Sequence, residues 1–538
     1  MDRRAFLAMA GGAGAAVLSG VGFQRWQEID PVLHSPGMAE GHYLRDLQRG
    51  RNTLPPPGRV IDTDIVILGS GIAGLAAAWQ LKKLGHAGAL MIDGPQAFGN
   101  AAGGRFGDLA YPTGAHYLPL PSMESTHVRG ILADLGLIVR DPMGIKPTYD
   151  ERHVLHGPEE RLLHQGVWHD GPLPHNLAPA EAAEHKRFIA EMDGMRHLRG
   201  ADGRRAFAFP SVQSSDDSTL AALDRLSMKQ WMDQRGYVAP TLHWYVNYCC
   251  RDDYGTRYDK VSAWAGLHYF CSRGGQAANA ADDAWLTWPG GLQPLAEGMA
   301  RISGIERRAG SAVSLKRAGD GVEALCFTLA GGVASTYLVR ARKAICAMPL
   351  FVAARVVDDI ASYGFDPKAH MPAYAPWLVA NFLMKGFPAE LPEAPLSWDN
   401  VVYQEPGLGY VVSTHQDIRR TPPEKTVFSA YVALSDRTPD EARRWMRSAT
   451  PGELVELASA DLKAAYGWKF AANVERVEMT LRGHAMAVPA PGFRANAGLL
   501  ALRSASGPIA FASADLSGFS VFEEAAWWGC EAARRVVS

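Results

Sequence analysis

Residues 63–74 read Thr-Asp-Ile-Val-Ile-Leu-Gly-Ser-Gly-Ile-Ala-Gly, and this stretch decides the fold. The apolar run that ends at Leu68 is typical of a strand buried in a parallel sheet. A glycine-rich turn follows, after which an alanine- and leucine-rich segment predicts a helix over 72–84 that stops at Gly85. Residues 89–92 predict a second strand. Strand, glycine turn, helix and strand in this order predict a dinucleotide-binding α/β unit.

Each glycine of the turn has a predicted role in holding the dinucleotide. Gly69 permits the tight turn, Gly71 lets backbone N–H groups approach a pyrophosphate, and Gly74 lets helix and strand pack closely. Asp93 ends the second strand and is placed to accept hydrogen bonds from an adenosine ribose; no arginine follows it, which disfavours a ribose 2′-phosphate. The predicted contact residues are Gly69, Gly71, Ile72, Ala73, Gly74, Asp93 and Gly94.

A second glycine motif indicates which dinucleotide is bound. Gly103-Gly104-Arg105 precedes Pro112-Thr113-Gly114-Ala115-His116-Tyr117. These runs resemble the second fingerprint of the flavin-dependent amine oxidases, phytoene desaturases and protoporphyrinogen oxidases. The resemblance implies that the first run meets the phosphates and ribityl chain of FAD, that the Gly-Ala pair lies against the isoalloxazine ring, and that 95–102 is a small insertion. The implied contact residues are Gly104, Arg105, Gly114, Ala115, His116 and Tyr117.

Weaker matches to this family follow in the family's order. Residues 288–292 resemble its turn into a helix, and 311–313 resemble the strand whose valine backbone brackets the adenine. A buried strand is predicted over 509–512, followed by Asp515 and a helix over about 521–537. The resemblance implies a ribityl contact for the carboxylate, with an ordinary capping role as the alternative, and a helix N-terminus that stabilises negative charge on reduced flavin. The implied contact residues are Val313, Asp515, Val521 and Phe522.

The predicted architecture is α/β, with a Rossmann-type FAD-binding domain interleaved with a mixed α+β substrate domain that caps the ring. The predicted boundaries are a signal at 1–28, an extended lead-in at 29–58, the FAD-binding domain at 59–120, 285–352 and 484–538, and the cap at 121–284 and 353–483. The resemblance also implies non-covalent FAD. In the family, covalent attachment uses a cysteine near the closing motif, and the one cysteine there, Cys530, falls inside the predicted final helix.

Two residues are candidates for catalysis. Trp288 begins one of the family-like motifs, and His484 precedes the closing motif and could face the ring, although a lone histidine can equally be structural. The family places a lysine beside flavin N5 on a strand that corresponds to 377–384, but Val, Ala and Asn occupy 379–381. That lysine is linked to oxygen reactivity in the family, so its absence predicts a dehydrogenase rather than an oxidase.

The predicted cap is rich in aromatic residues. Residues 218–236 predict an amphipathic helix, and 237–270 follow with many tryptophans and tyrosines. Rings at helical spacing form either core or a substrate cage. The charged residues 251–253 interrupt this run, either as a solvated helix end or as an anchor for substrate.

The first 24 residues resemble a twin-arginine export signal. Arg3 and Arg4 precede a glycine-rich, mildly apolar stretch at 8–23 that is short for a membrane span. An ordinary N-terminal helix or an anchor is the alternative. The resemblance implies a partnership with the twin-arginine export machinery and a periplasmic or otherwise exported protein, tethered to the membrane only if the signal stays uncleaved.

Composition excludes other classes of function. The chain has 54 Lys+Arg against 56 Asp+Glu and is 47% apolar, which makes no electrostatic case for a nucleic-acid partner. Its six cysteines show no CxxC and no spacing typical of zinc ligands, so no metal is expected and the cysteines are predicted to be buried small hydrophobes.

These features predict an FAD-dependent oxidoreductase that takes a hydride from a small organic donor onto flavin N5, with an amine or polyamine as the first donor. The alternatives are a desaturase-type enzyme on an apolar substrate and a non-catalytic flavin-fold binding or assembly protein. A compact aromatic box with one or two acids would favour amines, and a long apolar tunnel would favour a polyene or porphyrin. A quinone or redox protein is expected to accept the electrons.

Overall fold

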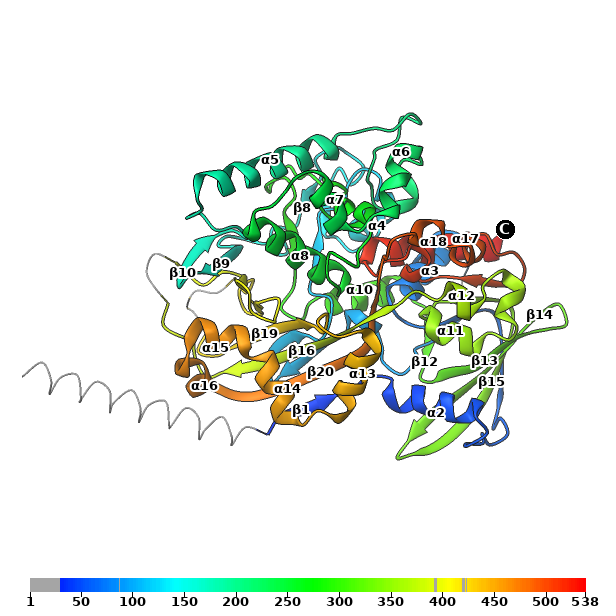
Figure 1. Ribbon diagram of the computed structural model, residues 1–538. Coiled ribbons are helices and arrows are strands. Elements are labelled where there is room, and N and C mark those ends of the chain that lie inside the picture. The colour runs from blue at the N-terminus through cyan, green and yellow to red at the C-terminus, as the bar shows by residue number, and fades with distance from the viewer. Residues whose placement is uncertain (1–29, 87, 391–393, 419–420, 422) are drawn as a thin grey trace, which may run out of the picture.

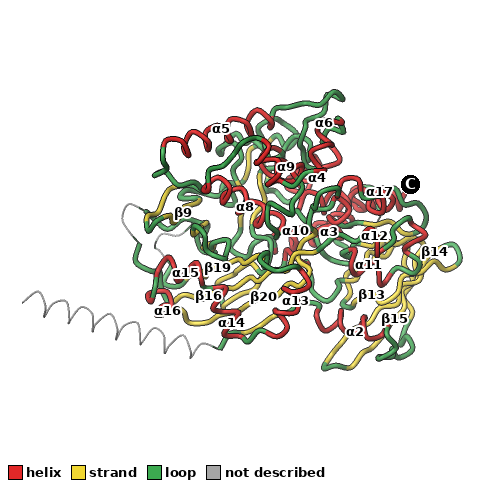
Figure 2. The backbone as a smooth tube through the Cα atoms, viewed as in Figure 1, coloured by secondary structure: helices red, strands yellow, loops and turns green. Residues whose placement is uncertain are grey.

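The computed structural model describes residues 30–86, 88–390, 394–418, 421 and 423–538. The predicted signal lies outside these residues. The described chain forms two large sheets that lie side by side, with a mainly helical layer above them (Figures 1 and 2). Among the described residues, no helix is long and apolar enough to cross a membrane.

The first sheet contains both predicted strands of the dinucleotide unit. In spatial order it holds β12 (Glu306–Arg308), β3 (Ala89–Ile92), β2 (Val60–Leu68), β15 (Val333–Cys346), β14 (Gly321–Ala330) and β13 (Ser311–Ala318), with β21 (Ile509–Phe511) also pairing with β15. The strands from β12 to β15 are parallel, and β21 runs parallel to β15, whereas β13 and β14 are antiparallel. The predicted parallel Rossmann-type sheet is confirmed.

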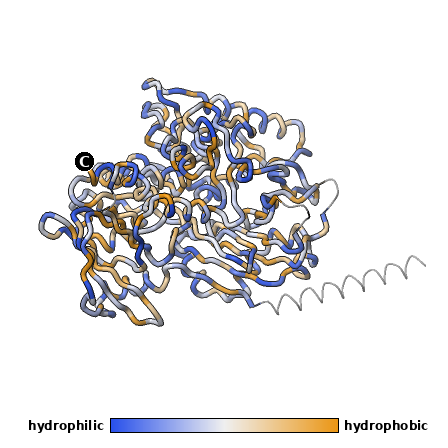
Figure 3. The backbone as a smooth tube through the Cα atoms, turned by 180° about the vertical axis from the view of Figure 1, so that it is seen from behind, coloured by the Kyte–Doolittle hydropathy of each residue, from blue (hydrophilic) through white to orange (hydrophobic). Residues whose placement is uncertain are grey.

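Helices cover both faces of this sheet because its central strand is apolar on both sides. Ile65 and Ile67 of β2 pack towards one layer of helices, and Val66 and Leu68 pack towards the other. The first layer holds α3 (Ile72–Lys83), α10 (Gln293–Ser303) and α18 (Phe522–Val537); the second holds α2 (Met38–Gln48), α11 (Leu350–Val356) and α17 (Ala497–Arg503). Apolar segments, orange in Figure 3, run along these strands.

The second sheet belongs to the cap. In spatial order it holds β1 (Val32–His34), β20 (Val474–Ala487), β16 (Tyr374–Met384), β19 (Thr426–Ala433), β18 (Tyr410–Val412), β17 (Asp399–Val402), β9 (Glu160–His164) and β10 (Val167–Asp170). Its outer face packs against α13 (Pro439–Ser448), α14 (Pro451–Ala458), α15 (Ala460–Tyr466) and α16 (Trp468–Asn473). The inner face, which includes Trp377 and Val379 of β16, packs against the aromatic residues of the cap.

The helical layer of the cap forms a separate core of its own. It is built from α5 (Pro179–Arg196), α6 (Ser218–Ala221), α7 (Met228–Gln234), α8 (Pro240–Tyr254) and α9 (Ala263–Cys271). The single helix predicted over 218–236 is wrong: the chain turns at Leu226, and Ser227 begins α7 with a capping box whose partner is Gln230. Trp264 and Tyr254 lie in this core.

Shorter elements complete the description. They are β4 (Gly103–Phe106), β5 (Leu109–Pro112), β6 (Tyr117–Pro119), α4 (Thr126–Asp134), β7 (Ile138–Arg140), β8 (Thr148–Tyr149), β11 (Trp285–Thr287) and α12 (Pro367–His370). All six cysteines are buried and free, which confirms their prediction as small hydrophobes.

The chain before the glycine unit differs from the predicted extended lead-in. β1 pairs with β20 of the cap, and α2 packs on the first sheet, where Tyr43 stacks on Phe327 at 5.3 Å between ring centroids. The helix was not predicted because the segment is polar overall and only a few apolar side chains, such as Leu44, form its packed face. The domain limits also shift: residues 350–365 pack with the first domain, and β20 stays in the cap sheet as far as Ala487.

Candidate functional site

The glycine turn forms an open cradle at the carboxyl end of β2. Gly69 has φ +115°, and a β-carbon on Gly74 would lie 2.0 Å from the carbonyl oxygen of Gly69, so both positions require glycine. A β-carbon on Gly71 would meet no protein atom within 4 Å. Ile72 begins α3 with no side-chain cap, so the first N–H groups of the helix are free to bind an anion. The turn therefore fits a dinucleotide pyrophosphate.

Asp93 lies where β3 ends, close to a cation that the sequence analysis missed. Nε of Arg307 donates to Oδ1 of Asp93 at 2.8 Å, and the same guanidinium lies over the ring of Phe98, 4.7 Å from its centroid. Gly94 forms an isolated antiparallel β-bridge with Gly310. Only the parallel pairing of β12 with β3 brings Arg307 here, and neighbouring positions in the sequence gave no signal for it.

The second fingerprint forms a hairpin and a tight loop. Gly103 N–H donates to Oε1 of Gln293 at 2.5 Å, and Ala115 N–H donates to the carbonyl of Asn100 at 2.8 Å. A β-carbon on Gly114 would lie 2.3 Å from that carbonyl, so no other residue fits there. The side chain of Arg105 is exposed and donates to the carbonyls of its own hairpin turn.

The predicted insertion at 95–102 belongs to the site. Its residues Gly99–Ala101 form a short 3₁₀ turn, and a β-carbon on Gly99 would lie 3.6 Å from Cα of Gly71. Because Asn100 also anchors Ala115, the insertion joins the first fingerprint to the second. This role was not predicted, since an insertion carries no motif.

In the closing segment, Asp515 already has hydrogen-bond partners within the protein, which the sequence did not indicate. Oδ2 of Asp515 accepts from Leu350 N–H at 2.8 Å and from the hydroxyl of Tyr374 at 2.6 Å, so this carboxylate links the two domains. Its ribityl contact stays a prediction. Phe522 begins α18 after Val521, as expected, but buried Glu523 and Glu524 occupy the first turn of the helix.

Three further predicted residues lie at a strand bulge, in the core and at the surface. Val313 lies at a bulge of β13, where the pairing with β14 shifts by one residue. Trp288 is 8% exposed, belongs to the main core and lies 5.4 Å from the ring of His153. His484 is exposed, and its ring stacks on Phe351 at 4.5 Å. Neither Trp288 nor His484 therefore joins the cluster of rings described next, and their catalytic roles stay predictions.

A cage of stacked rings follows the second fingerprint. His116 stacks on Tyr431 at 4.4 Å between centroids, and Tyr117 stacks on Trp285 at 5.0 Å. Trp398 lies 5.6 Å from His116 and 5.5 Å from Trp285. The hydroxyl of Tyr431 donates to the carbonyl of Gly114 at 3.2 Å, which ties the cage to the fingerprint. We call these five residues the aromatic cage.

Three carboxylates adjoin the aromatic cage. Asp399 begins β17 and lies opposite Glu160 in the parallel pairing with β9, and Asp252 comes from α8. We call Glu160, Asp252 and Asp399 the acid cluster. Electrostatic interactions join Asp252 and Asp399 to both Tyr117 and Tyr431. The cluster lies deep in the protein, yet each of its members is only half-buried, so a solvent-reachable space must adjoin them.

Burial and mutual repulsion disfavour the ionised form of the carboxyl groups in the acid cluster and raise their pKa values. Burial, followed by the charge of Asp252, raises the pKa of Glu160 to about 8. Burial and then Asp253 raise the pKa of Asp252 to about 7, and burial and then Glu160 raise that of Asp399 well above its usual range. Burial lowers the pKa of His116 to about 3, so this ring is neutral and repels no cation. The arrangement favours a positively charged ligand.

The strand expected to carry the family's lysine faces this region with neutral residues. Val379 is buried on the inner face, and Ala380 packs on the outer face. Asn381 is fully buried, donates from Nδ2 to the carbonyl of Pro112 at 3.0 Å, and accepts from the hydroxyl of Ser429 at 2.6 Å. The Asn381 amide therefore holds the backbone of the second fingerprint through this hydrogen bond to Pro112.

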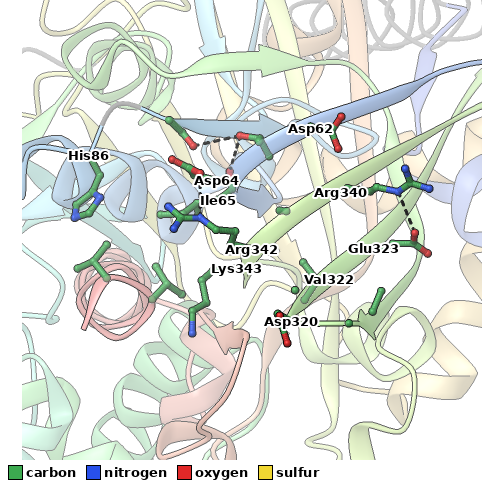
Figure 4. Close-up of a pocket in the computed structure, with 18 residues that line it drawn as sticks. Asp62, Asp64, Ile65, His86, Asp320, Val322, Glu323, Arg340, Arg342 and Lys343 are labelled. Atoms are coloured by element: carbon green, nitrogen blue, oxygen red, sulfur yellow. Dashed lines mark hydrogen bonds and ion pairs between the residues drawn. The ribbon is translucent and has the colours of Figure 1, made fainter.

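A surface groove elsewhere offers no competing site. It lies along the middle of β2 and β15, where their pairing joins Asp62 to Arg340 (Figure 4). The glycine turn follows the carboxyl end of β2, and none of its residues lines this groove. Two arginines of the groove pair with carboxylates there: Arg340 with Glu323 at 3.2 Å and Arg342 with Asp64 at 3.1 Å. Ligands of open α/β sheets bind at the carboxyl ends of the strands instead.

Comparisons with known proteins agree with this geometry. Residues 67–135 match the family of NAD(P)-binding Rossmann-like domains. No curated protein sequence matches the chain significantly. Putrescine oxidase, solved bound to putrescine, matches 89% of this chain and 99% of its own with 17% identity and a TM-score of 0.61.

Two further structures show the same fold. Cyclohexylamine oxidase from Brevibacterium oxydans matches 88% of this chain and 98% of its own, with 17% identity and a TM-score of 0.60. A CLA-producing fatty acid isomerase from P. acnes matches 88% and 99%, with 15% identity and a TM-score of 0.56. The chain thus has the fold that these amine oxidases share, built around a Rossmann-like dinucleotide-binding unit.

Proposed function

We propose that this protein is an FAD-dependent oxidoreductase whose donor is a small amine or diamine. The acid cluster beside the aromatic cage carries this proposal, since carboxylates and ring faces together recognise an ammonium group. Bound FAD supplies the hydride acceptor, N5 of its ring. The resemblance of the second fingerprint to flavin-dependent oxidases, and the fold shared with two amine oxidases, support the cofactor.

The residues of the chain have separate tasks in this proposal. The glycine turn and α3 hold the pyrophosphate, and Gly114 and Ala115 support the ring. The aromatic cage excludes water and orients the amine carbon for transfer of its hydride. An amine must lose its ammonium proton before its carbon gives up a hydride, and a carboxylate with a pKa of about 7 to 8, such as Asp252 or Glu160, is matched to accept it near neutral pH.

Anaerobic titration of the purified flavoprotein tests this function. An aliphatic diamine is expected to bleach the oxidised flavin band, and Asp252→Asn and Asp399→Asn are expected to raise KM for the diamine at least tenfold with little change for a neutral, uncharged donor. Bleaching by an unsaturated apolar substrate and by no amine would favour the desaturase-type alternative. No bleaching by either class would favour the binding or assembly protein.

We propose further that the enzyme is a dehydrogenase exported by the twin-arginine route. The absence of lysine at Val379 and Asn381 supports slow reaction with oxygen, and Arg3 and Arg4 support export to the periplasm, where a membrane quinone or a redox protein can accept electrons. Reduced protein should reoxidise slowly in air and quickly with a soluble quinone. Replacing both arginines by lysine should keep the protein in the cytoplasm.

A further inference from the structure

Arg482 connects the cap sheet to both fingerprints. It lies on β20 opposite Trp377 of β16. Nε donates to the carbonyl of Thr113 at 3.0 Å, Nη1 to side-chain oxygens of Gln96 and Asn100 at 3.0 and 3.2 Å, and Nη2 to the carbonyl of Gly99 at 3.5 Å and the hydroxyl of Thr113 at 3.4 Å. A guanidinium has five N–H donors, and all five have acceptors here.

None of these acceptors carries a charge. Across the described part of the chain, Arg482 forms no ion pair with a carboxylate. Burial lowers its pKa to about 10, so it remains protonated at neutral pH. Arg482 is half-buried, and a cation partly removed from water without a counter-ion carries a desolvation cost that a nearby anion would offset.

The position of Arg482 indicates which anion that is. Thr113, which accepts from Nε and Nη2 of Arg482, directly precedes the Gly114–Ala115 pair that supports the ring in the proposed function, and the hydroxyl of Tyr431 in the aromatic cage donates to the carbonyl of Gly114. Because all its N–H groups are occupied, Arg482 acts through its electric field and does not grip a ligand.

We propose that Arg482 is a positioning residue that clamps the 95–102 insertion to the second fingerprint and whose charge stabilises reduced flavin. A hydride brings two electrons and one proton, so its transfer leaves one negative charge on the ring unless a second proton follows. The field of Arg482 favours this anionic form over the neutral oxidised form. This inference rests on the proposed cofactor.

The test is the midpoint potential of the bound flavin, measured by spectroelectrochemistry on the holoprotein. Arg482→Gln is expected to weaken binding of reduced relative to oxidised flavin at least tenfold, which equals a fall of about 30 mV for a two-electron couple. Arg482→Lys should keep the potential. Arg443→Gln is the matched control, since Arg443 approaches the same strand but pairs with Asp440; it should leave the potential unchanged.

A pair of variants at Gln96 separates charge from clamping if Arg482→Gln does not fold. Gln96→Glu places a carboxylate against Nη1 of Arg482 and should lower the potential in the same way, whereas Gln96→Ala removes the hydrogen bond alone and should not. An unchanged potential in Gln96→Glu, or an equal fall in Gln96→Ala or Arg443→Gln, would overturn the inference. Wild-type protein that binds no FAD would instead overturn the proposed function.

Discussion

Replacing Glu160 by glutamine should stabilise the protein, and by more as the pH rises. Glu160 faces Asp399 across two parallel strands, and like charges directly opposite each other destabilise a sheet. Its pKa rises on folding from 4.5 to about 8, so the folded state holds a proton that the unfolded state releases. Stability is therefore lost as the pH rises from the unfolded pKa towards the folded one, and above about 8 the loss is complete.

The size of this effect follows from the shift. At about 1.4 kcal/mol per pKa unit, the ionisation of Glu160 costs roughly 3 kcal/mol more at pH 9 than at pH 5.5. Glutamine has no such cost. For a chain of this length the unfolding entropy makes 1 kcal/mol worth about 1 °C, so Glu160→Gln should gain roughly 3 °C over wild type between these two pH values.

Thermal unfolding followed by circular dichroism at several pH values measures this difference. Glu151→Gln is the control, because Glu151 is an exposed glutamate outside the acid cluster; it should track wild type at every pH. A difference between Glu160→Gln and wild type that does not grow with pH would refute the account of the acid cluster. Added diamine should abolish the advantage of the variant, since a bound cation relieves the same repulsion.

Three further outcomes are expected. Gly74→Ala should lose dinucleotide binding and colour, because its β-carbon would lie 2.0 Å from a backbone carbonyl; the absorbance spectrum checks this. His484→Gln should change kcat less than twofold in steady-state assays, because the exposed ring packs away from the aromatic cage. Asp515→Asn should lower the free energy of unfolding by about 1–3 kcal/mol in urea titrations, since the buried carboxylate accepts from both Leu350 and Tyr374.

The local motifs were predictable from sequence because their physical requirements are local. Residues 60–92 form the strand, glycine turn, helix and strand that the apolar run and glycines predict, and α18 begins within a residue of its predicted start. The acid cluster was only partly predictable. Asp252 stood out as a charge in an aromatic run, but Glu160 and Asp399 meet it through strand pairing across about 240 residues of sequence.

Arg482 and Arg307 were missed for the same reason. The partners of each arginine come from a strand or loop that is distant in sequence, and a single basic residue in a strand gives no local signal of those partners. The prediction of one helix over 218–236 failed on a different point. The apolar periodicity continues through Leu226, while Ser227 and Gln230 restart the helix with their own cap.

The contact between α3 and α18 limits when the protein can mature. A β-carbon on Gly529 of α18 would lie 2.1 Å from the carbonyl of Ala73 in α3, so α3 of the dinucleotide unit is covered by a helix that is distant in the sequence. β21 completes the sheet only from Ile509 onward. A ribosome needs roughly 20 to 90 s to make the residues that separate α3 from α18. During that time α3 lacks its covering helix, so the dinucleotide unit is completed only after α18 has been made.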